Sequence, residues 1–220
     1  MGLFGSKKKT ADETETTTTS EAVDLGKQSG KISLAKGSAV TIDKSDVIKA
    51  RCTWSSATDY DLYALVLLKN GETLVVSTFG SQDQPNPTTS VLNGAVRHMG
   101  DVGRGAAGIA EETIEIRMTD EIEAVFPIAY SAQSNGTGSF HKYNVSCSIE
   151  NGVGTEVTID SDNASRHMAI FTLAIGGIYN TTNGVRIEAL EKYSRMMSEK
   201  RPAIVKGKLV MDKGSLNLFK

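Results

Sequence analysis

The chain has 220 residues, of which 39% are hydrophobic and 23% charged, and its formal net charge is −2. This composition is typical of a globular protein with one domain of ordinary size. The nearly balanced charge argues against a nucleic-acid binder, which would carry a basic stripe or a high pI. The sequence has neither a secretory signal nor an apolar run near 18 residues, so we expect a cytoplasmic protein.

The first 30 residues have the composition of a flexible, disordered tail. Residues 10–20 are polar throughout and cannot bury enough apolar surface to offset the entropy cost of ordering them. The tip differs, because the apolar residues Met1, Leu3 and Phe4 precede the lysines Lys7 to Lys9. One interpretation is that Gly2 to Lys9 makes a peripheral contact with a membrane surface or a partner. Acylation of Gly2 and an inert tail are the alternatives.

From residue 31 the pattern becomes that of β-strands. Two strong candidates, 61–68 and 73–79, are joined by Asn70-Gly71, a favoured hairpin turn because both residues tolerate positive φ. Asn183-Gly184 predicts another hairpin, and Pro127 within the run 121–132 predicts an edge strand or a bulge. Short strands at this spacing without intervening helices predict an all-β protein, an antiparallel β-sandwich.

The C-terminal part of the sequence contains one helix candidate. Residues 190–200, LEKYSRMMSEK, place Leu190, Tyr193, Met196 and Met197 on one face at three- and four-residue spacing. We therefore expect a domain over 31–200 that ends in a C-terminal helix. Residues 201–220 form a basic extension, either a final hairpin turning at Lys213-Gly214 or a partner-binding segment.

Cysteine and histidine residues do not form an evident catalytic or zinc-binding pattern. Cys52 and Cys147 lie 95 residues apart and are expected to be buried, reduced thiols. His98, His141 and His167 are dispersed, without the spacing of a zinc site or a catalytic triad. We therefore expect a protein that is not an enzyme.

Two acidic, turn-forming segments stand about forty residues apart. The first is Asp59-Tyr60-Asp61, directly before the apolar run 62–68. The second is the glycine-rich loop 100–108, which contains Asp101 and is followed by Glu111-Glu112. If the neighbouring strands pair or pack, these segments meet at one end of the sandwich, where their carboxylates would form a cation site.

Several short motifs in residues 31–190 resemble the tellurium-resistance TerD domain family of bacterial stress proteins. Their order and spacing carry the resemblance, since no single motif is decisive. The motifs are Ile32-Ser33-Leu34-Ala35-Lys36-Gly37, Trp54 with Tyr60-Asp61-Leu62-Tyr63, Asn70-Gly71, His98-Met99-Gly100-Asp101, Gly103 to Gly108, Glu111-Glu112, Gly177-Ile178-Tyr179 and Val185 to Leu190.

The resemblance implies a β-sandwich that binds Ca²⁺ between acidic loops and acts in tellurite and general stress responses, and it does not imply an enzyme. The ligands it implies are Asp61, Asp101, Glu111 and Glu112, with Asp59 as a substitute from the neighbouring position.

The sequence also departs from the family pattern at four positions near these ligands. Tyr63, Val102 and Ala110 replace residues with oxygen ligands, and Arg104 would weaken cation binding by repulsion. The alternative hypothesis is therefore a metal-free β-sandwich that contacts protein partners, a second copy or a membrane through its tails.

Overall fold

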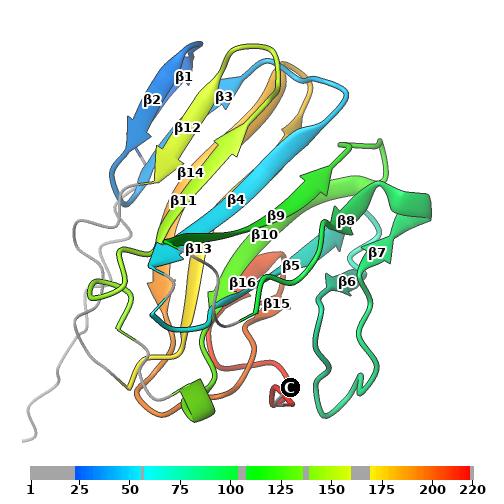
Figure 1. The fold of residues 1–220 in the computed structure, drawn as a ribbon. Coiled ribbons are helices and arrows are strands. Elements are labelled where there is room, and N and C mark those ends of the chain that lie inside the picture. The colour runs from blue at the N-terminus through cyan, green and yellow to red at the C-terminus, as the bar shows by residue number, and fades with distance from the viewer. Residues whose placement is uncertain (1–22, 56, 104–107, 136–138, 160–168, 219–220) are drawn as a thin grey trace, which may run out of the picture.

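The computed structural model describes residues 23–55, 57–103, 108–135, 139–159 and 169–218, and two seven-stranded sheets pack face to face in it (Figure 1). The first sheet has the order β1 (Val23–Lys27), β3 (Ser38–Ile42), β14 (Gly184–Tyr193), β13 (Thr172–Thr181), β10 (Ile122–Tyr130), β5 (Asp61–Leu68) and β6 (Thr73–Val76). The second has the order β2 (Lys31–Leu34), β12 (Glu156–Ile159), β11 (Ser146–Glu150), β4 (Ile48–Ser55), β9 (Ile109–Ile116), β8 (Val96–His98) and β7 (Ser90–Val91). These sheets confirm the all-β class.

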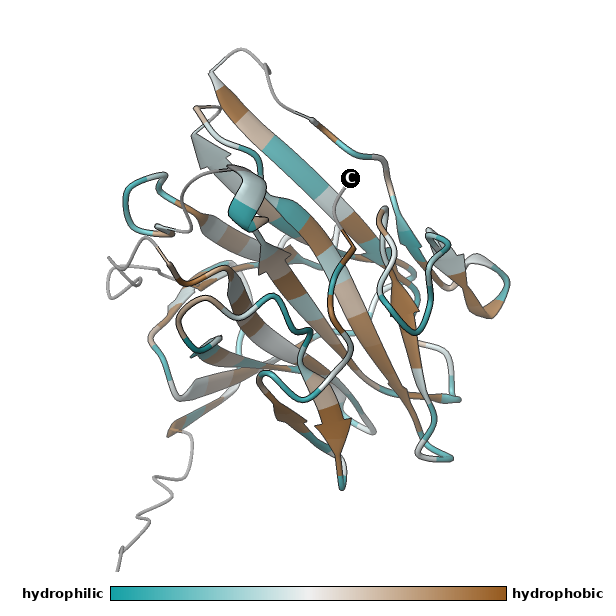
Figure 2. Ribbon diagram, turned by 90° about the horizontal axis from the view of Figure 1, so that it is seen from below, coloured by the Kyte–Doolittle hydropathy of each residue, from teal (hydrophilic) through white to brown (hydrophobic). Residues whose placement is uncertain are grey.

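The core between the two sheets follows from the period-two alternation of the strands. In β4, Ile48, Ala50, Cys52 and Trp54 are buried while the residues between them are half-buried. Figure 2 shows apolar residues along the strands and mostly hydrophilic connecting turns. Side chains that alternate in this way place one face of each strand in the core and the other toward solvent. Cys52 and Cys147 lie directly opposite each other on β4 and β11, both buried as free thiols as expected.

β5 is buried on both faces, which a simple two-layer sandwich does not explain. A second apolar cluster covers the outer face of the first sheet and includes Tyr63, Leu65, Phe126 and Tyr130. The C-terminal hairpin of β15 (Ala203–Val205) and β16 (Lys208–Val210) packs there, and it contributes the buried Leu209 to this cluster.

The C-terminal segment is therefore a third, partial layer of the fold. Of the two alternatives for residues 201–220, the hairpin is the one observed, but it turns at Lys206-Gly207 and not at Lys213-Gly214. Glu199 anchors the start of this segment to the end of β10, because its carboxylate accepts hydrogen bonds from the Tyr130 hydroxyl and the Gln133 backbone N–H.

The expected C-terminal helix is wrong. The described residues contain no α-helix, only the 3₁₀ turns η1 (Leu92–Gly94) and η2 (Gln133–Asn135). β14 instead continues to Tyr193, which pairs with Leu173 of β13. Beyond it the chain turns, and Met196 and Met197 are 63% and 56% exposed. β14 passes through a bulge at Glu191, whose φ is 41°, and Lys192 and Tyr193 then pair again with β13, which overrides a helical spacing that rested on four residues.

Two further expectations need correction at the edges of the sheets. The sandwich is mixed and not purely antiparallel, because β1 pairs parallel to β3 and β2 pairs parallel to β12. The boundary of the tail at residue 30 is also too late, since Val23–Lys27 forms β1. Residues 1–22, which include the tip from Gly2 to Lys9, lie outside the described residues.

The predicted hairpins and the predicted bulge agree better with the structure than the predicted helix does. Asn70-Gly71 joins β5 to β6. The second hairpin also forms, but its turn is Thr182-Asn183, because Gly184 already pairs with Thr181 as the first residue of β14. Pro127 lies in β10, an internal strand, where the register with β13 shifts between Val125 and Ile128. Of the two alternatives predicted for Pro127, the bulge is therefore confirmed and the edge strand is wrong. Within the described part of the chain, no helix has the length and apolar character needed to cross a membrane.

Candidate functional site

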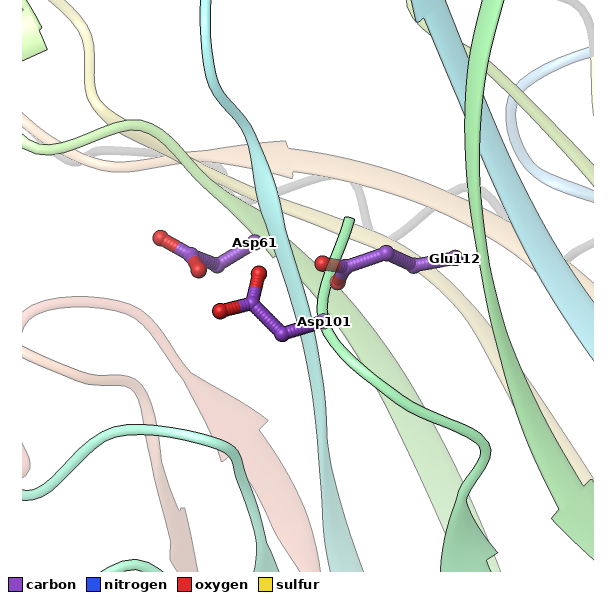
Figure 3. A group of neighbouring side chains, drawn as sticks. All are labelled: Asp61, Asp101 and Glu112. Atoms are coloured by element: carbon purple, nitrogen blue, oxygen red, sulfur yellow. The ribbon is translucent and has the colours of Figure 1, made fainter. Parts of the chain in front are cut away.

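Asp61, Asp101 and Glu112 come together at one end of the sandwich. Asp61 is the first residue of β5, Glu112 lies on β9 of the other sheet, and Asp101 belongs to the loop between β8 and β9. Each offers a carboxylate oxygen, and these three atoms lie within 4.8 Å of one another (Figure 3). Asp61 and Glu112 are 4% and 1% exposed, whereas Asp101 is open to solvent. The two acidic segments thus converge as the sequence predicted.

Glu112 is held in place by two backbone donors. Its Oε2 accepts a hydrogen bond from the Leu62 N–H at 2.6 Å, and its Oε1 accepts one from the Val102 N–H at 3.1 Å. Leu62 is on β5 and Val102 is in the loop that carries Asp101. The Glu112 carboxylate therefore links both acidic segments.

His98, at the end of β8, lies beside this carboxylate. Its Nε2 is 3.3 Å from Oε2 of Glu112, and the His98 and Glu112 side chains are both fully buried. The Nδ1 of His98 accepts a hydrogen bond from the Gly100 N–H at 3.1 Å, which leaves the second ring nitrogen to carry the proton. Nε2 thus lies beside the Glu112 carboxylate without making a hydrogen bond to it, and the Gly100 contact fixes the start of the Asp101 loop.

Two of the expected ligands lie outside this group of three. Glu111 is exposed on the other face of β9, where its Oε1 is 3.6 Å from Nε of Arg51. Asp59 is half-buried, and its backbone carbonyl accepts a hydrogen bond from the Ser131 hydroxyl at 3.0 Å. The structure therefore assembles three of the five expected carboxylates. The error at Glu111 follows from alternation, because adjacent residues in a strand point to opposite faces.

An aromatic cluster supports this end of the sandwich from inside. The Tyr60 ring centroid lies 5.2 Å from that of Phe140 and 6.0 Å from that of Trp54. Burial and the nearby thiol of Cys52 raise the pKa of the Tyr60 hydroxyl well above its ordinary value. Tyr60 is therefore a neutral packing residue that anchors the chain directly before Asp61.

The donor set fits a hard cation such as Ca²⁺. Three carboxylates provide up to six oxygen atoms, and Ca²⁺ takes six to eight oxygen ligands from carboxylates, carbonyls and water. Tyr63 does not compete for this space, because its ring faces the outer cluster at 5.5 Å from Phe79. Arg104, the residue expected to weaken the site, lies outside the described residues.

The sequence reasoning missed the role of His98 and the two backbone hydrogen bonds to Glu112. A signal for the orientation of Glu112 was nevertheless present. It shares the even-numbered positions of β9 with Ala110, Ile114 and Ile116, which are all buried in the core. Because the even-numbered residues of β9 face the core, the same alternation places Glu112 inward and Glu111 outward.

No protein-family model and no curated protein matches the chain. Among solved structures, the chain is similar to a crystal structure described as an unknown function protein, SAV2460, with 13% sequence identity and a TM-score of 0.47. The alignment covers 68% of this chain and 92% of the other. A likeness of this degree says nothing about function.

Proposed function

We propose that the protein is a non-catalytic, calcium-binding stress-response protein of the tellurium-resistance TerD type. In this proposal Asp61, Asp101 and Glu112 hold the cation at the end of the sandwich. The observation that carries the proposal is the convergence of three carboxylates, two of them buried, from both sheets. Buried carboxylates this close repel one another unless a cation or a proton compensates them.

The exposed position of Asp101 supports a site that a cation can enter from solvent. Asp61 and Glu112 would provide fixed oxygens from the strands, and Asp101 would close the site from the loop. Val102, whose N–H reaches Glu112, follows Asp101 directly, so a cation would tie this loop to both sheets. We propose that calcium binding orders this end of the molecule for contact with a protein partner in the cytoplasm.

Calcium titration of the full chain tests the proposal. With a dissociation constant of about 10 µM, 1 mM Ca²⁺ should raise the Tm by about 5–10 °C. Asp101→Asn should abolish this shift and preserve the fold, because Asp101 is exposed. Asp120→Asn is the matched control, an exposed aspartate before β10 at the opposite end of the sandwich. Absence of any heat or thermal shift at millimolar Ca²⁺ would refute the cation site.

One observation favours the metal-free alternative, an interaction module that uses the same sandwich. Glu112 already accepts two backbone hydrogen bonds and lies beside His98, so its carboxylate has a structural role without a cation. In that case the partner contacts would come from the tails, including Gly2 to Lys9. Deleting residues 1–9 should then reduce liposome co-sedimentation or partner pull-down, and unchanged binding would reject the tip as a contact.

A further inference from the structure

Arg201 is a buried cation at the start of the C-terminal segment. It is only 4% exposed, and its guanidinium lies 5.1 Å from the ring centroid of Tyr63 and 4.9 Å from that of Phe79. Both aromatic residues belong to the outer cluster of the first sheet. Arg201 is therefore enclosed by the third layer of the fold, far from the usual solvated position of an arginine.

The hydrogen bonds of this guanidinium go to neutral oxygens. Nε donates to Oδ1 of Asn217 at 2.6 Å, and Nη2 donates to the carbonyl oxygens of Phe79 at 3.0 Å and Gly80 at 3.1 Å. Among the described residues, no carboxylate forms an ion pair with Arg201, and Nη1 donates no hydrogen bond. Three of the five N–H groups are thus satisfied, and the two on Nη1 remain for another acceptor.

A buried charge without a counter-ion is costly in free energy, so such a group calls for a physical explanation. Burial lowers the pKa of the Arg201 guanidinium, yet an arginine remains charged in a protein at neutral pH. Carbonyl dipoles and aromatic faces solvate part of this charge but do not neutralise it. An anion at Nη1 would complete the environment.

A cavity of about 260 Å³ lies next to Arg201. Its walls combine apolar side chains with a few polar groups, an arrangement typical of sites that bind small molecules. The apolar walls are Leu65, Val75, Pro202, Ala203 and Ile204, and the polar ones include Ser81, Ser215 and Asp83. Because a liquid water occupies about 30 Å³, this volume suits a ligand of about six to ten non-hydrogen atoms.

We propose that this cavity binds a monocarboxylate with a short apolar body, whose carboxylate accepts hydrogen bonds from Nη1 of Arg201. The apolar part packs against Val75, Pro202 and Ile204. A dianion such as phosphate fits less well, because the cavity offers one cation and Asp83 lines it with a negative charge. The same carboxylate chemistry is found in a free organic acid and at the C-terminus of a peptide.

Titration of the full chain with isovalerate in calcium-free buffer tests this inference independently of the proposed cation site. The Nε–H resonance of Arg201 and the neighbouring amides should shift saturably, with a dissociation constant on the order of 1 mM. Isovaleramide, which has the same shape without the charge, should produce no such shifts at tenfold higher concentration. Inorganic phosphate should bind at least about tenfold more weakly than isovalerate.

Variants that keep Arg201 avoid the risk of unfolding the protein. Ala203→Phe fills the cavity from β15 and should abolish the isovalerate shifts without lowering the Tm. Val205→Phe is the control on the same strand, because Val205 is 45% exposed and does not line the cavity. Asp83→Asn should tighten isovalerate binding about threefold by removing a like charge.

The inference is overturned by absence of shifts at Arg201, by equal shifts with isovaleramide, or by isovalerate shifts that survive Ala203→Phe. If Asp83 is instead the counter-ion of Arg201, Asp83→Asn lowers the Tm and leaves isovalerate without effect, which also overturns it. N-acetylglycylvaline distinguishes the two ligand sources. At least tenfold tighter binding than isovalerate assigns the site to a peptide C-terminus, and weaker binding assigns it to a free acid.

Discussion

The Glu112 carboxylate on β9 accepts a hydrogen bond from the backbone N–H of Leu62 on β5, so a single buried side chain joins the two sheets at the acidic end. The same carboxylate also accepts the Val102 N–H through its other oxygen. Both donors are backbone groups and need an acceptor when buried. Glu112 therefore has a structural role whether or not a cation is bound.

Glu112→Gln should destabilise the protein by about 2 kcal/mol in calcium-free buffer. A glutamine offers one acceptor oxygen where two backbone donors need two, and its amide N–H₂ would face one of them. The neighbouring Glu111→Gln is the matched control and should change the free energy of unfolding by less than about 0.5 kcal/mol. Urea unfolding measures both, and equal effects would contradict the assigned orientations.

The two buried thiols should make stability fall at alkaline pH. Burial raises the pKa of Cys147 to about 12 and that of Cys52 well above its ordinary value. The folded thiols stay protonated while those of the unfolded chain ionise from about pH 8.5. Their contribution is thus complete below that pH and is lost as pH rises toward the folded pKa values, by about 3 kcal/mol between pH 8 and 10 for both thiols together.

Urea unfolding at pH 8 and pH 10 measures this loss. The double variant Cys52→Ala, Cys147→Ala should be less stable at pH 8 because of the space it leaves in the core, but it should lose clearly less stability up to pH 10. Part of the loss remains, because burial also raises the pKa of Tyr60, Tyr63 and Tyr130 above that of unfolded tyrosine. The hypothesis fails if the double variant loses as much stability as the original protein over this interval.

Met197→Gly should stabilise the protein by about 0.5–1 kcal/mol. Met197 has a φ of 60°, a left-handed conformation that costs a methionine energy and a glycine almost none. Met196 is similarly exposed but is not among the residues of positive φ, so Met196→Gly should destabilise. In a helix both changes would cost about 1 kcal/mol. Chemical denaturation of the two variants therefore distinguishes the two conformations: effects of opposite sign indicate the turn, and equal losses indicate the helix expected from sequence.

Gly184→Ala should cost at least about 2 kcal/mol, because a Cβ at this position would overlap the carbonyl oxygen of Ile42. Gly37 provides the comparison, since it has a φ of 77° but no atom within 4 Å of the place that a Cβ would occupy. Gly37→Ala should therefore cost about 1 kcal/mol, for the backbone conformation alone. Thermal unfolding that gave the two variants the same Tm would contradict the close approach of β14 to β3.

The parts of the fold that sequence predicted well depend on local patterns. Residues 61–68 form β5 as expected, and Asn70-Gly71 forms its hairpin turn, because alternation and turn chemistry act over a few residues. The parallel pairing of β1 with β3 arises because β2, which lies between them in the chain, joins the other sheet. Local sequence contains no signal for that partnership.

The helix error and the site errors have related physical causes. Leu190 and Tyr193 fitted a helical spacing, but β14 continues past a bulge at Glu191, and Lys192 and Tyr193 pair with β13. Asp61 and Asp101 were correctly expected to converge because the strands beside them pack together. Glu111 was misplaced because its strand orientation was not followed residue by residue. The Arg201 cavity was not foreseeable, since its components come from segments joined only by the third layer.

The C-terminal layer also has a consequence for synthesis of the protein on the ribosome. The outer apolar cluster around Tyr63, Leu65 and Phe126 is complete only when Leu209 and its neighbours arrive. During translation, both sheets can assemble while this face remains uncovered. Nascent or prematurely terminated chains would therefore expose an apolar surface that promotes aggregation. We expect them to depend on chaperones until the hairpin of β15 and β16 has emerged.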